Sequence, residues 1–287
     1  MKNILLDFLS LTKPKLISLV LTTTLAGFYI GSNGSLNLDL MAITLIGTTF
    51  VAAGALVLNQ HIERESDGLM KRTCNRPLPD GRLKPRDALI FGLVLSIAGL
   101  YINFVHINIL TGILSLLSLS VYLFVYTPMK KKSAFCVVVG AVPGALPPAG
   151  GWIAATGSLE MGALVLFAIL FFWQIPHSLA IAGLYRSDYE RAGIKLLPDF
   201  NAESNATGHQ VLLNTMALLP IGLMPSIIGI SGQIHFFTAL VLGAAFAVFA
   251  AQFAMNRSIP SAKNLLHASY LYIPFLLGIM SYDRITL

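Results

Sequence analysis

Charged residues are scarce in this sequence. Only 11% of the 287 residues are Asp, Glu, Lys or Arg, whereas soluble domains usually contain about 25%. Apolar residues make up 55% of the chain, and the mean hydropathy is +0.75. These values exclude an ordinary soluble domain and predict an integral membrane protein.

Cysteine is also rare. The two cysteines, Cys74 and Cys136, are too far apart in the sequence to form a metal-binding pair, and they do not resemble a disulfide framework. We therefore expect both thiols to be free.

The apolar residues form long runs of the length that crosses a bilayer as a helix, about 17 to 25 residues. These runs predict nine transmembrane helices, and no soluble domain or low-complexity segment lies between them. We expect an all-α bundle, formed by one polytopic domain over residues 1–287, around a central cavity that opens to the cytoplasmic side. The predicted spans are 16–33, 38–58, 87–104, 108–127, 134–154, 161–182, 210–229, 235–255 and 265–283.

Basic residues are nearly absent from one side of the predicted membrane. Of the 19 Lys and Arg residues, 18 lie on one side and only Arg284 lies on the other. The positive-inside rule therefore places the N-terminus and the two long polar segments in the cytoplasm and the C-terminus outside the cell membrane. The net charge of +6 does not indicate nucleic-acid binding, because the basic residues lie between apolar spans.

A polar stretch, NQHIERESDGLMKRTCNRPLPDGR (59–82), follows the second predicted span. Asn59, Glu63 and Asp67 are four residues apart, so on a helix with about 100° per residue they form one stripe. Ionisable groups at a membrane are costly and often mark functional sites. Proteins commonly hold Mg²⁺ with one or two carboxylates together with substrate phosphates. The stripe is therefore a candidate catalytic Mg²⁺ site.

Three cations, Lys71, Arg72 and Arg76, follow the stripe. Lysine and arginine suit phosphate oxygens, and arginine can bind two of them at once. We interpret them as candidate phosphate-binding residues. A solvated loop whose carboxylates form surface ion pairs is the alternative interpretation.

A second polar segment, WQIPHSLAIAGLYRSDYERAGIKLLP (173–198), closes the sixth predicted span. Its candidate site residues are His177, Tyr185, Arg186 and Asp188. Both polar segments end even-numbered spans, so they would converge on one cavity if the helices form a closed bundle. For His177, a packing role within the span is the alternative.

The fifth span contains the Gly- and Pro-rich stretch VVVGAVPGALPPAGGW (137–152). Proline removes backbone hydrogen bonds, so we expect a kinked helix whose freed carbonyl groups face neighbouring helices or a cavity. Close helix packing and a widened lumen are both consistent with this composition.

The two polar segments and the link YTPMKKKS (126–133) resemble the protohaem IX farnesyltransferases (haem O synthases), a branch of the UbiA-type intramembrane prenyltransferases. The resemblance extends over essentially the whole chain. Gln60 and Glu63 occupy positions that are aspartates in the wider superfamily, which is typical of the haem branch. Lys195 and Cys74 depart from the pattern, because proline and arginine, respectively, are usual there.

The resemblance implies transfer of the farnesyl group of farnesyl diphosphate to a vinyl group of protohaem IX (haem B), with addition of water, to give haem O and diphosphate. It implies Mg²⁺ as the cofactor and haem B as a substrate. Membrane lipid and a haem A-forming enzyme are the further expected partners, and nucleic acid is not expected. Asn59, Glu63 and Asp67 would hold the metal, with Asp188 as a second metal or phosphate-side ligand. The expected substrate-binding residues are Lys71, Arg72, Arg76, Tyr126 and Lys130 for diphosphate, Tyr185 and Arg186 for phosphate or haem propionates, and His177 for haem iron or propionates.

Three other functions are consistent with parts of the pattern. A UbiA-type enzyme that prenylates a phenol or quinone precursor would share the fold, but the Gln60 and Glu63 pattern disfavours it. A transporter would place its ionisable residues near the middle of the membrane, whereas here they gather at one face. A non-catalytic assembly protein would need neither the polar stripe nor the basic cluster.

Overall fold

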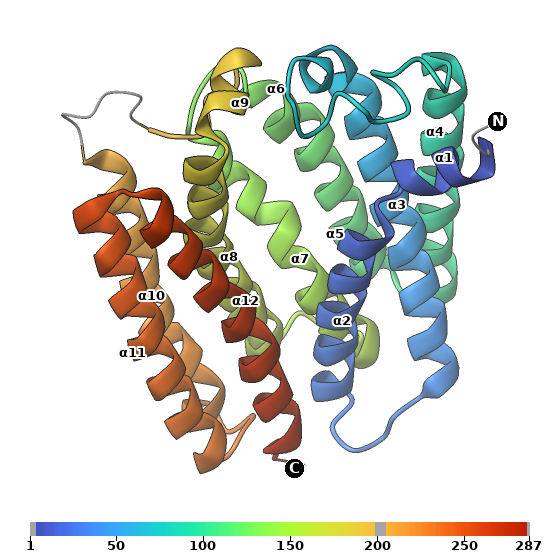
Figure 1. Cartoon of the computed structure of the whole chain (residues 1–287). Coiled ribbons are helices and arrows are strands. Elements are labelled where there is room, and N and C mark those ends of the chain that lie inside the picture. Colours follow the sequence, from blue (N-terminus) through green and yellow to red (C-terminus); the bar gives the residue numbers. More distant parts are fainter. Residues whose placement is uncertain (1–3, 199–204, 286–287) are drawn as a thin grey trace.

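The protein is helical throughout the part that the computed structural model describes, residues 4–198 and 205–285 (Figure 1). No strand occurs in these residues apart from one isolated bridge between Ser231 and Arg284. Nine helical segments within them are long and apolar enough to cross a membrane. They are α2 (Pro14–Gly31), α3 (Leu38–Gly68), α4 with the π-helical turn η1 (Pro85–Ile107), α5 with the π-helical turn η2 and α6 (Ile109–Met129), α7 (Cys136–Thr156), α8 (Met161–Leu184), α10 (Ala206–Ile227), α11 (Gln233–Asn256) and α12 (Ile259–Tyr282). The prediction of a nine-helix, multi-pass membrane protein is confirmed.

The second helix is longer than its predicted span. The apolar run ends near residue 58, but α3 continues to Gly68. Glutamate, arginine and glutamine in the extension are good helix formers, and Gln60 anchors it by donating from Nε2 to the carbonyl oxygen of Leu11 at 2.6 Å. The polar stripe therefore lies on a rigid helix and not in a loop.

A short helix, α1 (Ile4–Leu11), precedes the first span and lies across the bundle (Figure 1). Leu11 is fully buried against Val57, Leu78 and Leu83. The chain then turns at Lys13, and Pro14 begins α2, a position where proline is favoured because its missing N–H is not needed there.

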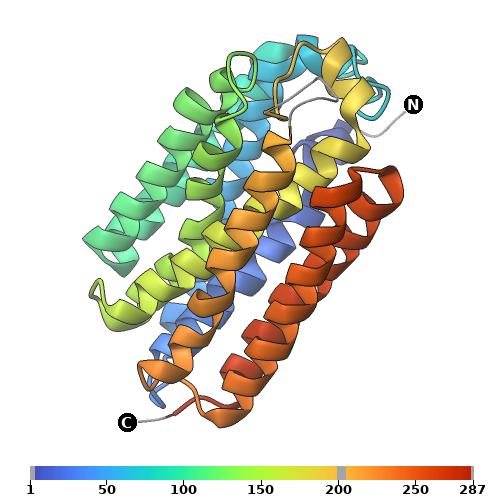
Figure 2. The ribbon, with the colours of Figure 1, turned by 90° about the vertical axis from the view of Figure 1, so that its left-hand side faces the viewer.

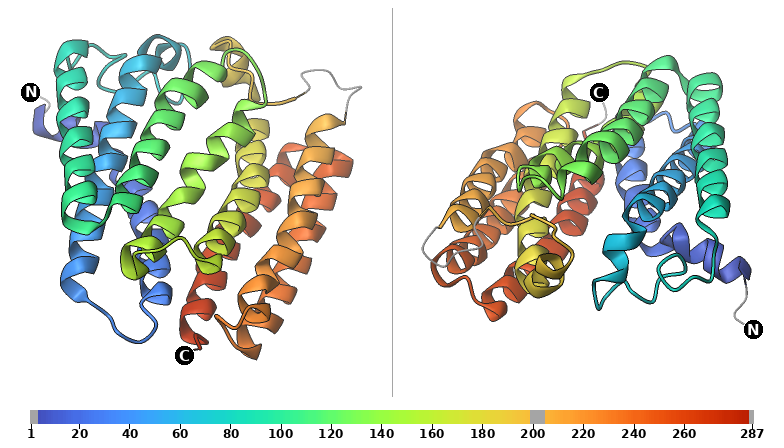
Figure 3. Two further views of the ribbon diagram at one scale, coloured as in Figure 1. Left: turned by 180° about the vertical axis from the view of Figure 1, so that it is seen from behind. Right: turned by 90° about the horizontal axis from the view of Figure 1, so that it is seen from above.

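Helices α7 and α8 lie between two groups of helices (Figure 3). On one side α7 packs against α2 and α5, and α3 packs against α4. On the other side α8 packs against α10 and α12, and α11 packs against both of these. The helix with the most proline therefore has neighbours on several sides, and it is also the most buried of the nine spans.

Helices α2 and α7 approach each other closely because glycine faces the partner backbone at two points. A Cβ atom at Gly27 would lie 2.0 Å from the carbonyl oxygen of Pro148, and one at Gly151 would lie 2.1 Å from that of Thr24. Any larger residue at either position would have to push the helices apart. Close packing thus accounts for part of the Gly- and Pro-rich composition of α7.

The segment between α3 and α4 and the short helix α9 (Arg186–Arg191) lie together at one end of the bundle, which we call the polar end (Figures 1 and 2). Residues 69–84 form turns there. The buried residues Met70, Ala192 and Ile194 join the two segments in one small apolar cluster. The expected convergence of the two polar segments is therefore observed. Residues 199–204, which follow the second segment, lie outside the described residues.

Candidate active site

The stripe on α3 binds side chains from two other segments. Asn59 Nδ2 donates to Thr127 Oγ1 at 3.1 Å. Glu63 pairs with Lys130, whose Nζ lies 2.8 Å from Oε1. Asp67 pairs with Arg76, whose guanidinium lies 2.7 Å from Oδ2. The stripe thus joins the end of α3 to the chain after η2 and to the turns after α3.

Asn59 and Asp67 are each only 2% exposed. Burial of an unpaired carboxylate is costly, and the C-terminal end of a helix disfavours a negative charge, so Asp67 depends on its guanidinium partner. Thr73 also holds the local backbone, because its hydroxyl donates to the carbonyl oxygen of Asp67 at 2.7 Å. The site is therefore tightly structured before any ligand binds.

The stripe offers hard oxygen donors for a divalent cation. Asn59 uses its amide nitrogen toward Thr127, which leaves Oδ1 for a ligand, and Asp67 uses only Oδ2 toward Arg76. Among residues 4–198 and 205–285, no group of three or more His, Cys, Asp and Glu side chains is arranged to hold a metal ion. The donor chemistry accordingly fits Mg²⁺ that is shared between a few protein oxygens and substrate phosphates, rather than a closed protein cage.

Lys13 belongs to the same cluster and was not expected there. Its φ of 51° is uncommon for a residue other than glycine. Burial, together with the nearby positive charges of Arg76 and Lys130, lowers the pKa of Lys13 to about 8. In the sequence, Lys13 is only one of the basic residues that indicate membrane orientation. The one local feature that could have singled it out is its position between a short amphipathic segment and Pro14.

Lys130 lies between two partners, the carboxylate of Glu63 and the aromatic ring of Tyr126. Its Nζ lies 4.5 Å from the centre of the Tyr126 ring, in addition to its contact with Glu63. Burial by itself would lower the pKa of Lys130, but Tyr126 and Glu63 outweigh burial and raise the pKa above its ordinary value. Lys130 is therefore a permanent positive charge at this site.

Arg72 connects the turns after α3 to α9. Its NH2 group donates to the hydroxyl of Tyr189 at 3.1 Å, and its guanidinium lies 4.8 Å from the centre of the Tyr185 ring. Lys71 and Arg72 are both exposed on these turns, but within the described residues no such contact holds Lys71. Arg72 is thus held in place by stacking and by one hydrogen bond, while Lys71 faces outward.

The other charged residues of α9 pair among themselves. Asp188 forms an ion pair with Arg191, and Arg191 also donates to the carbonyl oxygen of Leu69 at 3.3 Å. Arg186 lies 2.7 Å from Glu190. Asp188 therefore takes part in docking α9 onto the end of α3, and the structure does not bring it into contact with the stripe.

His177 faces α12. Its Nδ1 lies 2.8 Å from Ser269 Oγ, and its ring stacks on Trp173 with 4.9 Å between the ring centres. The structure therefore places His177 at the contact between α8 and α12, apart from the ionic cluster.

A cavity of about 470 Å³, which we call the interhelical cavity, extends from the polar end between α2, α3, α7 and α8. Arg72, Tyr126 and Tyr189 line it at the polar end, and most of its remaining wall is apolar. Gln174 and Ser178, which were not singled out from the sequence, add polar groups on α8. The lining includes Leu16, Ala55, Val137, Gly140, Pro143 and Ile181. The glycines and prolines of α7 thus widen a lumen on one face of the helix and permit close packing on another.

Comparison with known proteins agrees with this arrangement. Residues 20–272 match the UbiA prenyltransferase family. A protoheme IX farnesyltransferase from Solibacter usitatus is 42% identical, in an alignment that covers 97% of this chain and 98% of the relative. One from Aquifex aeolicus is 38% identical over 99% of this chain and 97% of the relative.

Solved structures of low sequence identity share the fold. A structure of digeranylgeranylglyceryl phosphate synthase is 18% identical with a TM-score of 0.81, and 99% of each chain is covered. A UbiA homologue from Archaeoglobus fulgidus, bound to GPP and Mg²⁺, is 14% identical with a TM-score of 0.64, over 96% of this chain and 99% of that one. The match over residues 20–272, together with the protoheme IX farnesyltransferases at 38–42% identity, establishes that the chain belongs to the UbiA prenyltransferase family.

Proposed function

We propose that the protein transfers the farnesyl group of farnesyl diphosphate to a vinyl group of protohaem IX, with addition of water, and releases haem O and diphosphate. The observation that carries the proposal is the pairing of Lys130 with Glu63 and of Arg76 with Asp67, near the charge of Lys13 and next to Tyr126, which lines a mainly apolar cavity. Relatives at about 40% identity are named protoheme IX farnesyltransferases, which favours haem over a phenol as the acceptor.

The cations of the polar end would bind the diphosphate group. Lys13 and Lys130 come before and after the stripe in sequence, and Lys13 lies near enough to feel the charges of Lys130, Arg76 and the two carboxylates. Arg76 and Arg72 add guanidinium groups, which can hold phosphate oxygens in pairs. These preorganised charges would stabilise the negative charge that develops on the departing diphosphate, usually the largest single contribution in such reactions.

Asn59, Glu63 and Asp67 would hold Mg²⁺ together with the diphosphate oxygens. When bound there, the metal would supply further positive charge to the leaving group. Lys130 would then exchange part of its contact with Glu63 for a phosphate oxygen, and Arg76 would do the same with Asp67. The ion pairs thus keep the carboxylates in place until the substrate arrives.

The apolar wall of the cavity would protect the reactive carbon. The bond between farnesyl C1 and the diphosphate oxygen breaks, and C1 forms a new bond with the terminal carbon of the haem vinyl group. Water then adds to the vinyl carbon next to the porphyrin ring and releases a proton. Gln174 and Ser178 are polar groups on the α8 wall, and we propose that they position this water. Water that reached the site earlier would quench the farnesyl cation.

The haem would lie toward α8 and α9. His177 forms a hydrogen bond with Ser269 through Nδ1, so Nε2 would be available to the haem iron. A hydrogen bond at one ring nitrogen commonly orients a histidine that binds a metal through the other. Tyr185 and Arg186, which contact Arg72 and Glu190 at the polar end, would bind the propionates. Asp188 would act through Arg191, by fixing the position of α9.

The distribution of 18 of the 19 basic residues supports a cell-membrane protein whose polar end, N-terminus and cavity mouth face the cytoplasm, with the C-terminus outside. We propose that residues 1–287 form one catalytic domain in the membrane lipid. Transfer of the product to a haem A-forming enzyme stays a prediction.

The test is a reaction in membranes that contain the protein, with haem B, farnesyl diphosphate and Mg²⁺, followed by mass analysis of the haem, and with a parallel reaction in EDTA. A farnesylated and hydrated haem that is lost with the chelator would support both the substrates and the metal. Prenylation of added 4-hydroxybenzoate, without any haem product, would contradict the proposal and assign the protein to the phenol-prenylating branch.

A further inference from the structure

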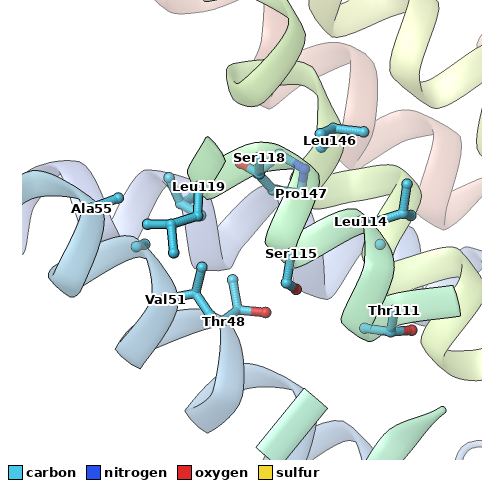
Figure 4. A pocket seen from close by; sticks show the side chains of 13 residues that line it. Thr48, Val51, Ala55, Thr111, Leu114, Ser115, Ser118, Leu119, Leu146 and Pro147 are labelled. Carbon is cyan, nitrogen blue, oxygen red and sulfur yellow. The ribbon is translucent and has the colours of Figure 1, made fainter. Parts of the chain in front are cut away.

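A second, narrow cavity of about 70 Å³ lies next to the interhelical cavity, and Figure 4 shows residues that line it. The two cavities adjoin each other, because five residues line both of them. These are Val20, Ala52, Ala55, Ser118 and Pro147. The narrow cavity is too small for a porphyrin, but it is wide enough for part of a thin, flexible chain.

Helix α3 forms a continuous track from the candidate diphosphate site to the narrow cavity. Ala55, Ala52 and Thr48 line the cavities and lie four, seven and eleven residues before Asn59, which places them on the same face of the helix. Eleven residues at 1.5 Å rise correspond to about 16 Å. Small side chains along this length leave room for a chain beside the helix.

The length of the track matches a farnesyl chain. Three bonds of an extended peptide span about 3.5 Å, so the four chain bonds of an isoprene unit span about 4.5 Å, and three units about 14 Å, by the same bond geometry. A fourth unit would bring the chain to about 18 Å, again by that geometry, which exceeds the distance from Asn59 to Thr48.

The inner end of the track is held by a buried hydrogen bond. Asn103, in the π-helical turn η1, is fully buried and donates to Ser115 Oγ at 2.7 Å. A Cβ atom at Gly47 of α3 would lie 2.0 Å from Asn103 Oδ1. Asn103 therefore ties η1 to Ser115 of α5, which lines the narrow cavity, and packs closely against Gly47 of α3, so lengthening of the cavity on this side would disturb this hydrogen bond.

We propose that the narrow cavity receives the last isoprene unit of the prenyl donor and limits the donor to fifteen carbons, a proposal that rests on the proposed function. Leu114 and Leu146 supply the apolar end of the pocket (Figure 4). Gly150 sets its free width, because it lines the pocket and no atom lies within 4 Å of the place where its Cβ would be. These three residues are the determinants of chain length.

The proposal predicts opposite changes for two kinds of variant. Gly150→Leu places a side chain in the pocket and should shift the preference from the C15 to the C10 diphosphate. Leu114→Ala extends the pocket and should raise the use of the C20 diphosphate. One isoprene unit exceeds the single methylene that changes specificity by roughly 10- to 200-fold in an apolar pocket, so we expect a shift of at least about tenfold in either direction.

Matched controls are available on faces of the bundle away from the pocket. Gly278 on α12 is exposed, and no atom lies within 4 Å of the place where its Cβ would be, so Gly278→Leu is the control for Gly150→Leu. Leu117 on α5 is 44% exposed, and Leu117→Ala is the control for Leu114→Ala. Neither control should change the preference for chain length.

The experiment supplies geranyl, farnesyl and geranylgeranyl diphosphates together with haem B and Mg²⁺, and measures the ratio of the three prenylated haems by mass. This ratio is internal to each sample and does not depend on the amount of folded enzyme. An unchanged ratio in a pocket variant that still forms haem O would overturn the proposal, so one variant that folds is enough for the test.

A binding measurement separates this proposal from the proposed function. The thermal stabilisation of the purified protein by the non-reactive thiolodiphosphates of the same three chains needs no haem. If the wild-type protein prenylates no haem but Gly150→Leu still reverses the preference from C15 to C10, the proposed function fails and the chain-length determinant stands. An unchanged order of stabilisation in both pocket variants would reject the determinant.

Discussion

Asp67 provides the most direct test of the α3 stripe. Asp67→Asn keeps the shape of the side chain but removes the charge that pairs with Arg76 at 2.7 Å. A hydrogen bond between charged groups contributes about 1.5–3 kcal/mol to stability. Arg76 is 27% exposed and can reach water after the change, so we expect a loss of about 2 kcal/mol or less in unfolding free energy and a folded protein in the membrane.

The effect of Asp67→Asn on catalysis should be larger than its effect on stability. Removal of one preorganised group that stabilises developing charge typically lowers kcat by about 10²- to 10³-fold. The assay is the initial rate of haem O formation at saturating farnesyl diphosphate, with thermal unfolding in detergent as the measure of folding. Glu65→Gln is the matched control, because Glu65 lies on the same helix with a side chain that is 83% exposed. A rate for Asp67→Asn within about threefold of the Glu65→Gln rate would refute the role of the stripe in the mechanism.

Three further changes test other parts of the site and the fold. Because the pKa of Lys13 is about 8, the free enzyme loses this positive charge as the pH rises through 8, so the KM for farnesyl diphosphate should increase between pH 7 and 9. Lys13→Arg, which stays protonated, should flatten that profile, and an equally steep rise in the variant would contradict the assignment. Arg72→Lys loses the planar contact with Tyr185 and the hydrogen bond to Tyr189, so steady-state kinetics should give a KM for farnesyl diphosphate that is about tenfold higher, as expected for about 1.4 kcal/mol of binding. Gly27→Leu should lower the thermal stability of the protein by about 1–3 kcal/mol or more through overpacking, and wild-type stability in detergent would show that α2 and α7 can separate at no cost.

The number and approximate ends of the membrane helices could be predicted from the sequence, because the bilayer itself requires a long apolar run for each crossing. The convergence of the two polar segments could be anticipated as well, since both close spans at the same side. The extension of α3 to Gly68 could not be predicted from hydropathy, because it depends on burial of Gln60 against α1 and on the pairing of Asp67 with Arg76.

The chemical types in the candidate site were determined by the sequence: a helical stripe of one amide and two carboxylates, followed by cations. Their partners were decided by the tertiary structure alone. Lys13 enters the cluster because a left-handed residue turns the chain between α1 and α2. Asp188 pairs with Arg191, which docks α9 onto the end of α3 through the carbonyl oxygen of Leu69. Local spacing shows which side chains share one helix face, whereas the meeting of charges from separate helices depends on how the helices pack, and the close approach of backbones at Gly27 and Gly151 sets that packing.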